Sequence, residues 1–503
     1  MAFTLGMILE ARERLKGVPQ RTGLVQFKAL SDEHSQIYLK TEDLQNTGSF
    51  KVRGAYIKIA SLSEEERACG VIASSAGNHA QGVALAARAF GVPATIVMPA
   101  GAPLSKVKAT RELGANVVLH GSVYDDAYAE ACRIQQETGA TFIHPFDDPM
   151  VIAGQGTIGL EIMDDLPDVD TIVVPIGGGG LASGVASAVK MLHPNVRVIG
   201  VQAAGAAGMK ASIEAGHVVS LDTAKTIADG IAVKKPGDLT FALCQQYVDE
   251  VVTVSEDEIA SAILALMEGQ KTVAEGAGAV PVAAVMFGKV DTSEKKTVCV
   301  VSGGNVDVTT LSRIITKGLS KAGRIAEIST KVADKPGSLL QLLKVVADSG
   351  ANILSINHAR EDQHSDVGAC MVSMVLETRD AAHVEQIRRE LTAMGWKRSK
   401  KAGIQRMPAF FSSIPGLQRD LIEHGQDIVH RGGPLFRSGP VQHHPAPVHH
   451  QDPVSILHRV AEVMGDHHGR QMLFTDDSVR QGHDDLSGLG VQGRRVLVQN
   501  QEF

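Results

Sequence analysis

Short apolar runs alternate with alanine-rich helical stretches along residues 1–320. Because strands that are buried on both faces are continuously apolar, this alternation predicts an α/β fold with a mainly parallel sheet between two layers of helices. Ligands of such sheets bind beyond the carboxyl ends of the strands, so the residues after each strand are candidates for chemistry. The predicted buried strands are 94–99, 116–120, 171–176, 196–202 and 297–304, and the clearest helices are 79–90 and 106–114.

A second pattern begins near Arg324, in the region 325–400. Its elements follow the order βαββα, which is typical of a ferredoxin-like module of about 75 residues. The expected strands are 324–334, 351–362 and 365–378, and the expected helices are 335–350 and 381–395. Leu339, Leu342, Leu343 and Val346 recur at helical spacing, so we expect them in the core of this module.

The region 401–503 has a different composition from the rest of the chain. It holds ten of the nineteen histidines, some in adjacent pairs, and prolines and glycines interrupt every periodic run. We expect a low-constraint, mostly disordered tail with one short helix at 454–463. Metal capture by the histidine pairs is a competing interpretation, but a polar tail without function is favoured. Deleting the tail should leave folding and activity intact.

Composition excludes several classes of protein. A formal charge of −7, a single Trp and the lack of a basic run argue against nucleic-acid binding. Five cysteines without CxxC spacing argue against disulfides and structural zinc, and indicate a reducing, cytoplasmic compartment. The uncharged stretch 172–189 contains Pro175 and four glycines, so we expect no membrane span. The chain also becomes charged too early for a signal peptide.

Lys51 follows Phe50 and precedes a helical run. A lysine flanked by Phe50 and Val52 is expected to be partly desolvated, which lowers the pKa of its amine and frees it for Schiff-base chemistry. A lone lysine is more often a solvated surface charge, so this segment alone is weak evidence.

The segment 74–82 follows an apolar run and opens a helix. Such a turn offers free backbone N–H groups and the positive end of a helix to an anion. Ser75 and Asn78 add side-chain partners for a carboxylate and a phenolic oxygen. An ordinary helix cap with turn glycines explains the same pattern equally well.

Four consecutive glycines, 177–180, separate a predicted strand from a predicted helix. Without side chains this backbone can wrap closely around a phosphate. A dinucleotide site competes, because Gly177, Gly179 and Ala182 satisfy the looser GxGxx(G/A) pattern. That site would need an acidic residue at the end of the next strand, which ends at Gln202 instead, so the phosphate interpretation is favoured.

Ser302 opens the segment SGGN directly after the last predicted strand. It can meet a ring nitrogen of a cofactor or form a simple turn. A serine tolerates a neutral ring, which suits elimination better than long-lived carbanion chemistry.

Together and in this order, these motifs resemble the fold type II pyridoxal-phosphate enzymes, and most closely the threonine dehydratases (threonine ammonia-lyases). The resemblance spans about residues 5–320. It implies two open twisted sheets flanked by helices, with a smaller subdomain at about 50–145 inserted in the larger one. It also implies pyridoxal 5'-phosphate as cofactor, and deamination by β-elimination of L-threonine to 2-oxobutanoate, or of L-serine to pyruvate, with release of ammonia.

The resemblance also implies roles for the residues of these motifs. Lys51 forms the Schiff base and acts as general base, while Phe50 packs against the cofactor ring. Asn78 bonds the phenolic oxygen, and Ser302 faces the pyridine nitrogen. The phosphate is held by Gly177, Gly178, Gly179, Gly180 and Leu181, and the substrate carboxylate by Ser75, Ala76, Gly77 and Asn78.

Three positions refine this picture. Serine racemases carry a proton-donating serine where this chain has Ala76, so little racemisation is implied. The divalent-cation site of related enzymes uses acidic residues at Gln202 and near Gly208, so we expect no metal site of that kind. Glu275 matches a family glutamate near the substrate, although a charge at a helix start explains it as well.

Residues 332–353 resemble an ACT domain, a small module that binds amino acids at paired interfaces. The resemblance implies a homodimer or homotetramer and an amino-acid effector, isoleucine or valine. With the amino-acid substrate, these are the expected partners; we expect no nucleic acid and no membrane.

Two other functions compete with the dehydratase. A racemase or β-replacement enzyme of the same fold would differ in its product, D-serine or a new thioether. A catalytically dead amino-acid sensor would use the ACT domain alone, but the chain retains Lys51, Asn78 and Ser302.

Overall fold

The computed structural model describes residues 3–15, 17, 19–360 and 368–396. The predicted tail at 401–503, with its short helix, lies outside the described residues. No helix of the described residues is long and apolar enough to span a membrane.

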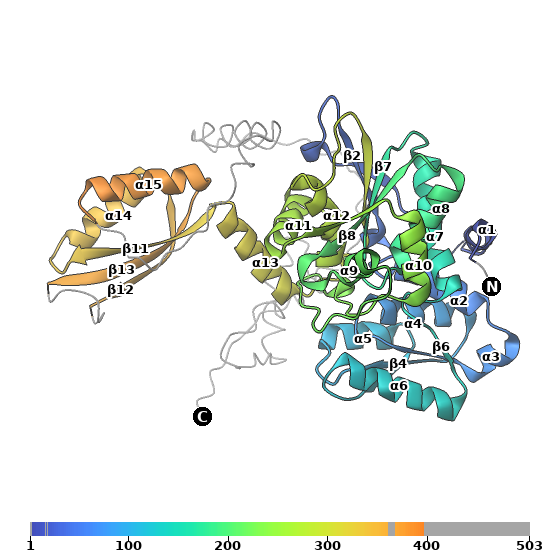
Figure 1. The fold of residues 1–503 in the computed structure, drawn as a ribbon. Helices are drawn as coiled ribbons and strands as arrows, with labels where there is room; N and C mark the ends of the chain where they lie inside the picture. The colour runs from blue at the N-terminus through green and yellow to red at the C-terminus, as the bar shows by residue number, and fades with distance from the viewer. Residues whose placement is uncertain (1–2, 16, 18, 361–367, 397–503) are drawn as a thin grey trace, which may run out of the picture. The chain divides into compact units, whose positions relative to one another are not determined.

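Six strands form the larger sheet, in the order β1-β2-β10-β7-β8-β9 (Figure 1). β1 pairs with β2 in antiparallel orientation, whereas all other neighbours in this sheet are parallel. The strands are β1 Leu24–Gln26, β2 Gln36–Thr41, β7 Thr171–Pro175, β8 Arg197–Ala203, β9 Glu250–Val254 and β10 Lys296–Val301.

Helices cover both faces of this sheet, as the continuously apolar strands predicted. Ile172 and Val174 of β7 pack in one core with residues of α7 and α8. Val173 lies between them in sequence but packs in a second core with residues of α11 and α12. The helices of this region are α1 Leu5–Arg14, α7 Pro149–Asp165, α8 Gly180–Leu192, α9 Gly208–Ala215, α10 Asp238–Tyr247, α11 Glu256–Gln270, α12 Gly276–Met286 and α13 Val308–Lys321.

A second, four-stranded parallel sheet has the order β5-β4-β3-β6, and its strands lie in sequence between β2 and β7 of the larger sheet. The strands are β3 Val71–Ser74, β4 Ala94–Met98, β5 Asn116–Leu119 and β6 Thr141–Phe142. The accompanying helices are α2 Lys51–Ala60, α3 Glu64–Cys69, α4 Asn78–Phe90, α5 Leu104–Glu112 and α6 Tyr124–Thr138.

One strand prediction was partly wrong. The segment 116–120 does form a strand, β5, but it is not buried: Asn116 and Leu119 are exposed, and Val117 and Val118 are half-buried. β5 is an edge strand of the smaller sheet, so it lacks a neighbour on one side. The apolar run of its sequence could not distinguish an edge strand from a central one.

The C-terminal module has the predicted βαββα order. Its three strands form an antiparallel sheet in the order β11-β13-β12. Leu342 and Val346 of α14 are fully buried, whereas Leu339 and Leu343 pack at the margin of the same core. The elements are β11 Ile325–Ala333, α14 Ser338–Asp348, β12 Asn352–Ala359, β13 Ala369–Glu377 and α15 Ala381–Ala393.

Candidate active site

The predicted motifs lie at the ends of parallel strands. The turn 75–77 follows β3 and leads into α4, and the glycines 177–180 connect β7 to α8. Ser302 follows β10, and Lys51 is the first residue of α2. The carboxyl ends of parallel strands are the places where α/β sheets bind ligands.

Backbone hydrogen bonds tie the Lys51 segment to the Ser302 segment. The N–H of Phe50 donates to the carbonyl of Ser302 at 3.1 Å, and the N–H of Gly304 donates to that of Gly48 at 2.9 Å. Ser49 and Gly303 form an isolated antiparallel bridge between these two bonds. Lys51 and Ser302 are therefore held close together, although 250 residues separate them in sequence.

The amine of Lys51 lies in a desolvated environment. Its Nζ donates to the carbonyl of Pro145 at 2.9 Å and lies 5.2 Å from the centroid of the Phe50 ring. Burial lowers the pKa of Lys51 to about 8, and the charge of Glu275 opposes this shift only in part. The desolvation that the flanking residues predicted is confirmed, and an amine with this pKa is deprotonated far more readily than an exposed lysine.

The four glycines pack too closely against their neighbours to carry side chains. A Cβ at Gly178 would lie 2.4 Å from the ring of Phe146, and one at Gly180 would lie 2.9 Å from its Cα. Gly179 adopts a left-handed conformation with φ 103°. Because Lys51 Nζ bonds Pro145, the residue before Phe146, the same short segment contacts both the amine and the glycine loop.

The backbone of this loop is suited to an anion. Within the described chain, none of the N–H groups of 177–180 donates to a protein acceptor, and they stand at the N-terminus of α8. Thr240 Oγ1 donates to the carbonyl of Gly178 at 2.6 Å and holds the loop in place. Leu181 is buried in the core, so its backbone is what it can offer a ligand. Free amides at a helix N-terminus fit a phosphate group.

Asn78 is fixed by two side chains. Its Nδ2 donates to Glu275 Oε1 at 2.7 Å, and its Oδ1 accepts from Asn305 Nδ2 at 2.8 Å. Asn305 also donates to the carbonyl of Thr47 at 2.6 Å, which connects it to the Lys51 segment. The amide of Asn78 is therefore oriented before any ligand arrives.

Glu275 is a buried carboxyl group at the start of α12. Burial raises its pKa to about 7, and the nearby charge of Asp229 adds to this effect. The hydrogen bond from Asn78 acts in the opposite direction. Glu275 can consequently change its protonation state near neutral pH, which a simple helix-start charge would not do.

The turn before α4 is half-buried. The N–H of Gly77 donates to Ser75 Oγ at 3.2 Å, and a Cβ at Gly77 would meet no atom within 4 Å. Gly77 thus borders open space beside Asn78, and Ser75 and Ala76 precede it in the same turn. Their binding of a substrate carboxylate stays a prediction.

Ser302 is almost completely buried, with 1% of its surface exposed. Its carbonyl accepts from Phe50, but in the part of the chain that the structure describes its hydroxyl has no hydrogen-bond partner. A buried hydroxyl of this kind is available to a ligand atom.

Sequence reasoning missed four contributors to this arrangement: Pro145, Phe146, Thr240 and Asn305. Pro145 and Phe146 lie just after β6, so the strand-end rule could have identified them had this two-residue strand been recognised. Asn305 stands within the predicted SGGN segment. Thr240 lies in α10, and no local pattern marks it.

Gln202 is one of the two positions at which no cation ligand is expected from the sequence. Its Nε2 donates to the carbonyls of Ile176 at 3.3 Å and Ala206 at 3.2 Å, and its Oε1 accepts from the N–H of Lys210 at 2.8 Å. The neutral amide is thus saturated by protein groups. The absence of a metal there remains a prediction.

Two family models match the chain. The model described as pyridoxal-phosphate dependent enzyme matches residues 15–304, and the ACT domain model matches residues 326–393.

Curated relatives extend this similarity. The L-threonine ammonia-lyase of Thermotoga maritima is 58% identical over 396 residues, which cover 78% of this chain and 98% of that protein. The catabolic L-threonine dehydratase of Escherichia coli K12 is 49% identical over 310 residues, which cover 61% of this chain and 94% of the relative.

Solved structures agree in fold. The processed form of threonine deaminase isoform 2 from Solanum lycopersicum superposes with a TM-score of 0.60 at 40% identity, covering 62% of this chain and 92% of that chain. Maize serine racemase superposes with a TM-score of 0.59 at 36% identity, covering 64% and 99%.

Proposed function

The chain belongs to the family of pyridoxal-phosphate dependent enzymes and carries an ACT domain, and from this premise we propose that it is a threonine ammonia-lyase. It deaminates L-threonine to 2-oxobutanoate and ammonia, and L-serine to pyruvate and ammonia. The observation that carries this proposal is the pairing of a low-pKa amine, Lys51, with a glycine loop of free amides across the segment Pro145–Phe146.

The residues present fit the cofactor. Lys51 would hold it through its amine, the loop 177–180 and the backbone of Leu181 would hold its phosphate, and the unpartnered hydroxyl of Ser302 would meet its ring nitrogen. Phe50 would contact the ring and Asn78 the phenolic oxygen. When bound, pyridoxal 5'-phosphate withdraws electron density from the substrate Cα, which makes loss of the α proton and of the β-hydroxyl feasible.

Lys51 is also the base of the reaction. Since its pKa is about 8, the amine is free in a useful fraction of molecules near neutral pH and can accept the α proton of the substrate. The backbone and side chains of the turn 75–78 bind the substrate carboxylate, which aims the Cα proton at Lys51. Burial of Phe50, Ser302 and Glu275 around the amine excludes water from this space.

Racemisation is the main competing activity, because maize serine racemase shares the fold. A racemase needs a proton donor on the face of the substrate opposite the lysine. Ala76 has no ionisable group, and the turn that contains it offers only the hydroxyl of Ser75, which accepts from Gly77. We therefore expect elimination to dominate.

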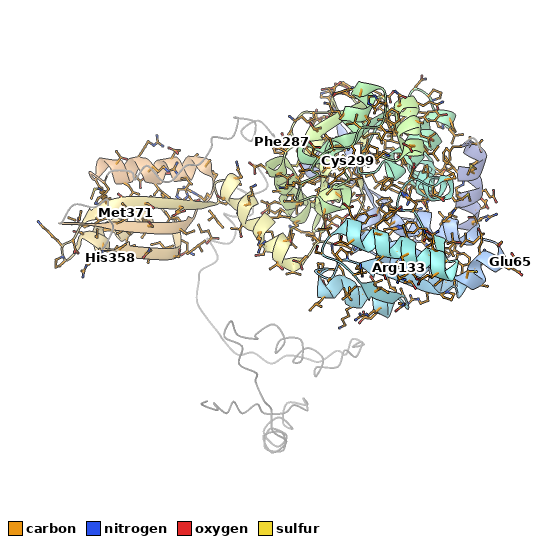
Figure 2. All side chains as sticks on the ribbon, turned by 60° about the horizontal axis from the view of Figure 1, so that its bottom comes forward. Glu65, Arg133, Phe287, Cys299, His358 and Met371 are labelled. Atoms are coloured by element: carbon orange, nitrogen blue, oxygen red, sulfur yellow. The ribbon has the colours of Figure 1, made fainter. Side chains whose placement is uncertain are left out.

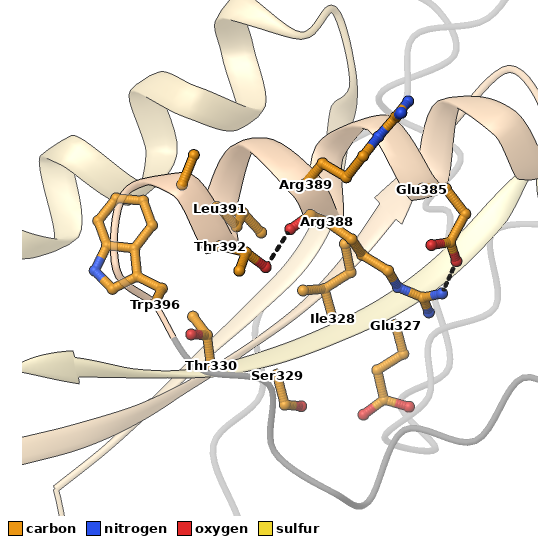
Figure 3. A pocket seen from close by; sticks show the side chains of 11 residues that line it. Glu327, Ile328, Ser329, Thr330, Glu385, Arg388, Arg389, Leu391, Thr392 and Trp396 are labelled. Atoms are coloured by element: carbon orange, nitrogen blue, oxygen red, sulfur yellow. Dashed lines mark hydrogen bonds and ion pairs between the residues drawn. The ribbon is translucent and has the colours of Figure 1, made fainter.

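The ACT domain binds an amino-acid effector, for which we propose isoleucine or valine. A pocket of about 520 Å³ lies between β11 and α15 (Figure 3). Its lining combines apolar Ile328, Leu391 and Trp396 with charged groups of both signs, as a zwitterion with an apolar side chain requires. Arg388 Nη1 bonds Glu385 at 2.5 Å, whereas its buried Nη2 has no partner and is available to a carboxylate.

We propose that the enzyme is a homodimer or homotetramer. Leu354 and Ile356 on the edge strand β12 are 51% and 43% exposed, and such apolar side chains are typical of a surface that pairs with a second copy. We also propose a reducing, cytoplasmic location, which is consistent with five cysteines that are all free thiols. Light scattering coupled to size exclusion would measure the assembly.

The decisive experiment is a steady-state assay of the holoenzyme. Release of 2-oxo acid from L-threonine and L-serine would be measured with and without isoleucine or valine, and D-serine would be quantified in parallel. We expect 2-oxobutanoate from threonine and little D-serine. Production of D-serine at a rate comparable with elimination would contradict the proposed activity. A rate that neither isoleucine nor valine changes would contradict only the proposed regulation by these amino acids.

A further inference from the structure

Three potential metal ligands meet at one end of the ACT-domain sheet. Asp334 directly follows β11, His358 lies near the end of β12, and Cys370 lies near the start of β13. β13 is the central strand, and its pairing register places Cys370 opposite Val332 and Val372 opposite His358. Three strands thus deliver one ligand each to the same end of the sheet (Figure 2 labels His358).

The ligand atoms are close enough to share one ion. His358 Nε2 lies 2.9 Å from Cys370 Sγ, and one ligand atom from each of the three residues lies within 4.8 Å of the others. Tetrahedral zinc with bonds of about 2.0–2.3 Å places its ligand atoms about 3.3–3.7 Å apart. His358 and Asp334 are exposed, so their side chains can adjust by the small amount required, whereas buried Cys370 is fixed by the strand.

The ligand types select the metal. A thiolate and an imidazole favour zinc and similar borderline-soft ions over calcium and magnesium, which prefer oxygen ligands. Three protein ligands leave a fourth position for water or for another ligand. Asp334 also contacts the guanidinium of Arg360 at 3.3 Å, but that ion pair is exposed and therefore weak.

We propose that the ACT domain binds a zinc-class divalent transition metal through Asp334, His358 and Cys370. The ion joins the ends of three strands that come from distant parts of the module. It therefore stabilises the domain by mass action, and it does so independently of the cofactor site. The prediction of no metal concerned Gln202 and Gly208. No ligand spacing in the sequence marks Asp334, His358 and Cys370, and only the sheet register brings them together.

Cobalt(II) binding to the full-length holoenzyme tests this proposal. A thiolate ligand gives Co²⁺ a ligand-to-metal charge-transfer absorption that histidine and carboxylate ligands do not give. The ten histidines beyond residue 401 can therefore bind cobalt without producing this signal. We expect about one thiolate–cobalt site per chain, displaced by zinc.

The variants define the ligands. Cys370→Ser should abolish the band, and His358→Ala and Asp334→Ala should each weaken cobalt binding by at least about tenfold. The matched controls Cys69→Ser and His217→Ala change exposed residues outside the cluster and should leave the band unchanged. Since Asp334 and His358 are exposed, their variants keep the test valid even if Cys370→Ser does not fold. A wild-type chain without the band, or a band that survives in Cys370→Ser, would overturn the proposal.

Discussion

Helix α2 carries two cations, buried Arg53 and half-buried Lys51, in opposite environments. Arg53 is 1% exposed and is paired with two carboxylates. Lys51, two residues earlier, bonds a single neutral carbonyl. The two side chains lie on the same helix, and the comparison separates the effect of burial from the effect of a counter-charge.

The Arg53 side of the helix is a saturated ion cluster. Nε and Nη2 donate to Glu42 at 2.9 and 2.8 Å, and Nη1 and Nη2 donate to Glu161 at 2.7 and 2.9 Å. Lys40 donates to Glu161 at 2.6 Å as well. Burial lowers the pKa of Arg53, but the two carboxylates outweigh it and raise that pKa above its ordinary value. This cluster stabilises the fold and takes no part in the chemistry proposed for Lys51.

The Lys51 side lacks such compensation. Burial lowers the pKa of Lys51, and Glu275, whose charge opposes this shift, is hydrogen-bonded to Asn78 instead. A desolvated amine therefore becomes reactive where no carboxylate forms an ion pair with it. Breaking either arrangement should have distinct consequences.

The largest effect is expected for Lys51→Ala. Removal of both the cofactor-holding amine and the base should reduce kcat by at least about a thousandfold, while far-ultraviolet circular dichroism stays unchanged. Lys58→Ala, on the same helix but paired with Asp148 at 2.7 Å, is the matched control and should retain turnover. Substantial turnover of Lys51→Ala would remove this lysine from the mechanism.

Arg53→Ala should instead affect stability. It leaves Glu42 buried without its counter-ion and Glu161 paired with Lys40 alone, which should cost about 3–5 kcal/mol of unfolding free energy. The control Arg197→Ala breaks an exposed pair with Glu250 and should cost about 0–1 kcal/mol. Urea denaturation would measure both, and equal losses would show that the cluster is not a structural unit.

Gly178→Ala should weaken cofactor retention. Its Cβ would lie 2.4 Å from the Phe146 ring, and such overpacking costs about 1–3 kcal/mol, or about thirtyfold in affinity at the centre of that range. Gly101→Ala, where a Cβ meets nothing within 4 Å, is the control. Fluorescence titration of the apoenzyme with pyridoxal phosphate would compare them, and unchanged affinity in Gly178→Ala would place the phosphate elsewhere.

The smallest effect is expected for Glu275→Gln. Because the pKa of Glu275 is raised from 4.5 to about 7, its contribution to stability is present below pH 4.5 and is lost as the pH rises through 7. The thermal stability of the variant should therefore depend less on pH in that window. Because Glu275 also changes its charge beside the site, the pH–rate profile of the wild type should show an inflection near pH 7 that the variant lacks. If the inflection of the pH–rate profile persists unchanged in Glu275→Gln, it arises from the titration of another group.

The sequence predicted β4, β5, β7, β8 and β10 and the motifs at strand ends because both are local patterns, but it did not identify β1, β2 or β9. Continuous apolar runs identified β4, β7, β8 and β10, and the glycine run identified the loop before α8. The flanking aromatic residue correctly indicated that Lys51 is desolvated.

What the sequence could not predict depends on contacts between distant segments. Glu161 lies 108 residues from Arg53, and Glu275 lies 197 residues from Asn78. No periodicity or spacing links such pairs. Only the packing of α2 against α7, and the meeting of the N-terminal ends of α4 and α12, bring them together. The meeting of Asp334, His358 and Cys370 has the same origin, since the sheet register determines it.

The most direct test of the account is to identify the lysine that carries the cofactor. The holoenzyme would be reduced with borohydride and digested, and the pyridoxyl-labelled peptide would be located by mass spectrometry. The account predicts the label on Lys51, with the fraction labelled in the reconstituted apoenzyme rising as the pH of reconstitution passes through about 8. A label on any other lysine, with Lys51 unmodified, would contradict it.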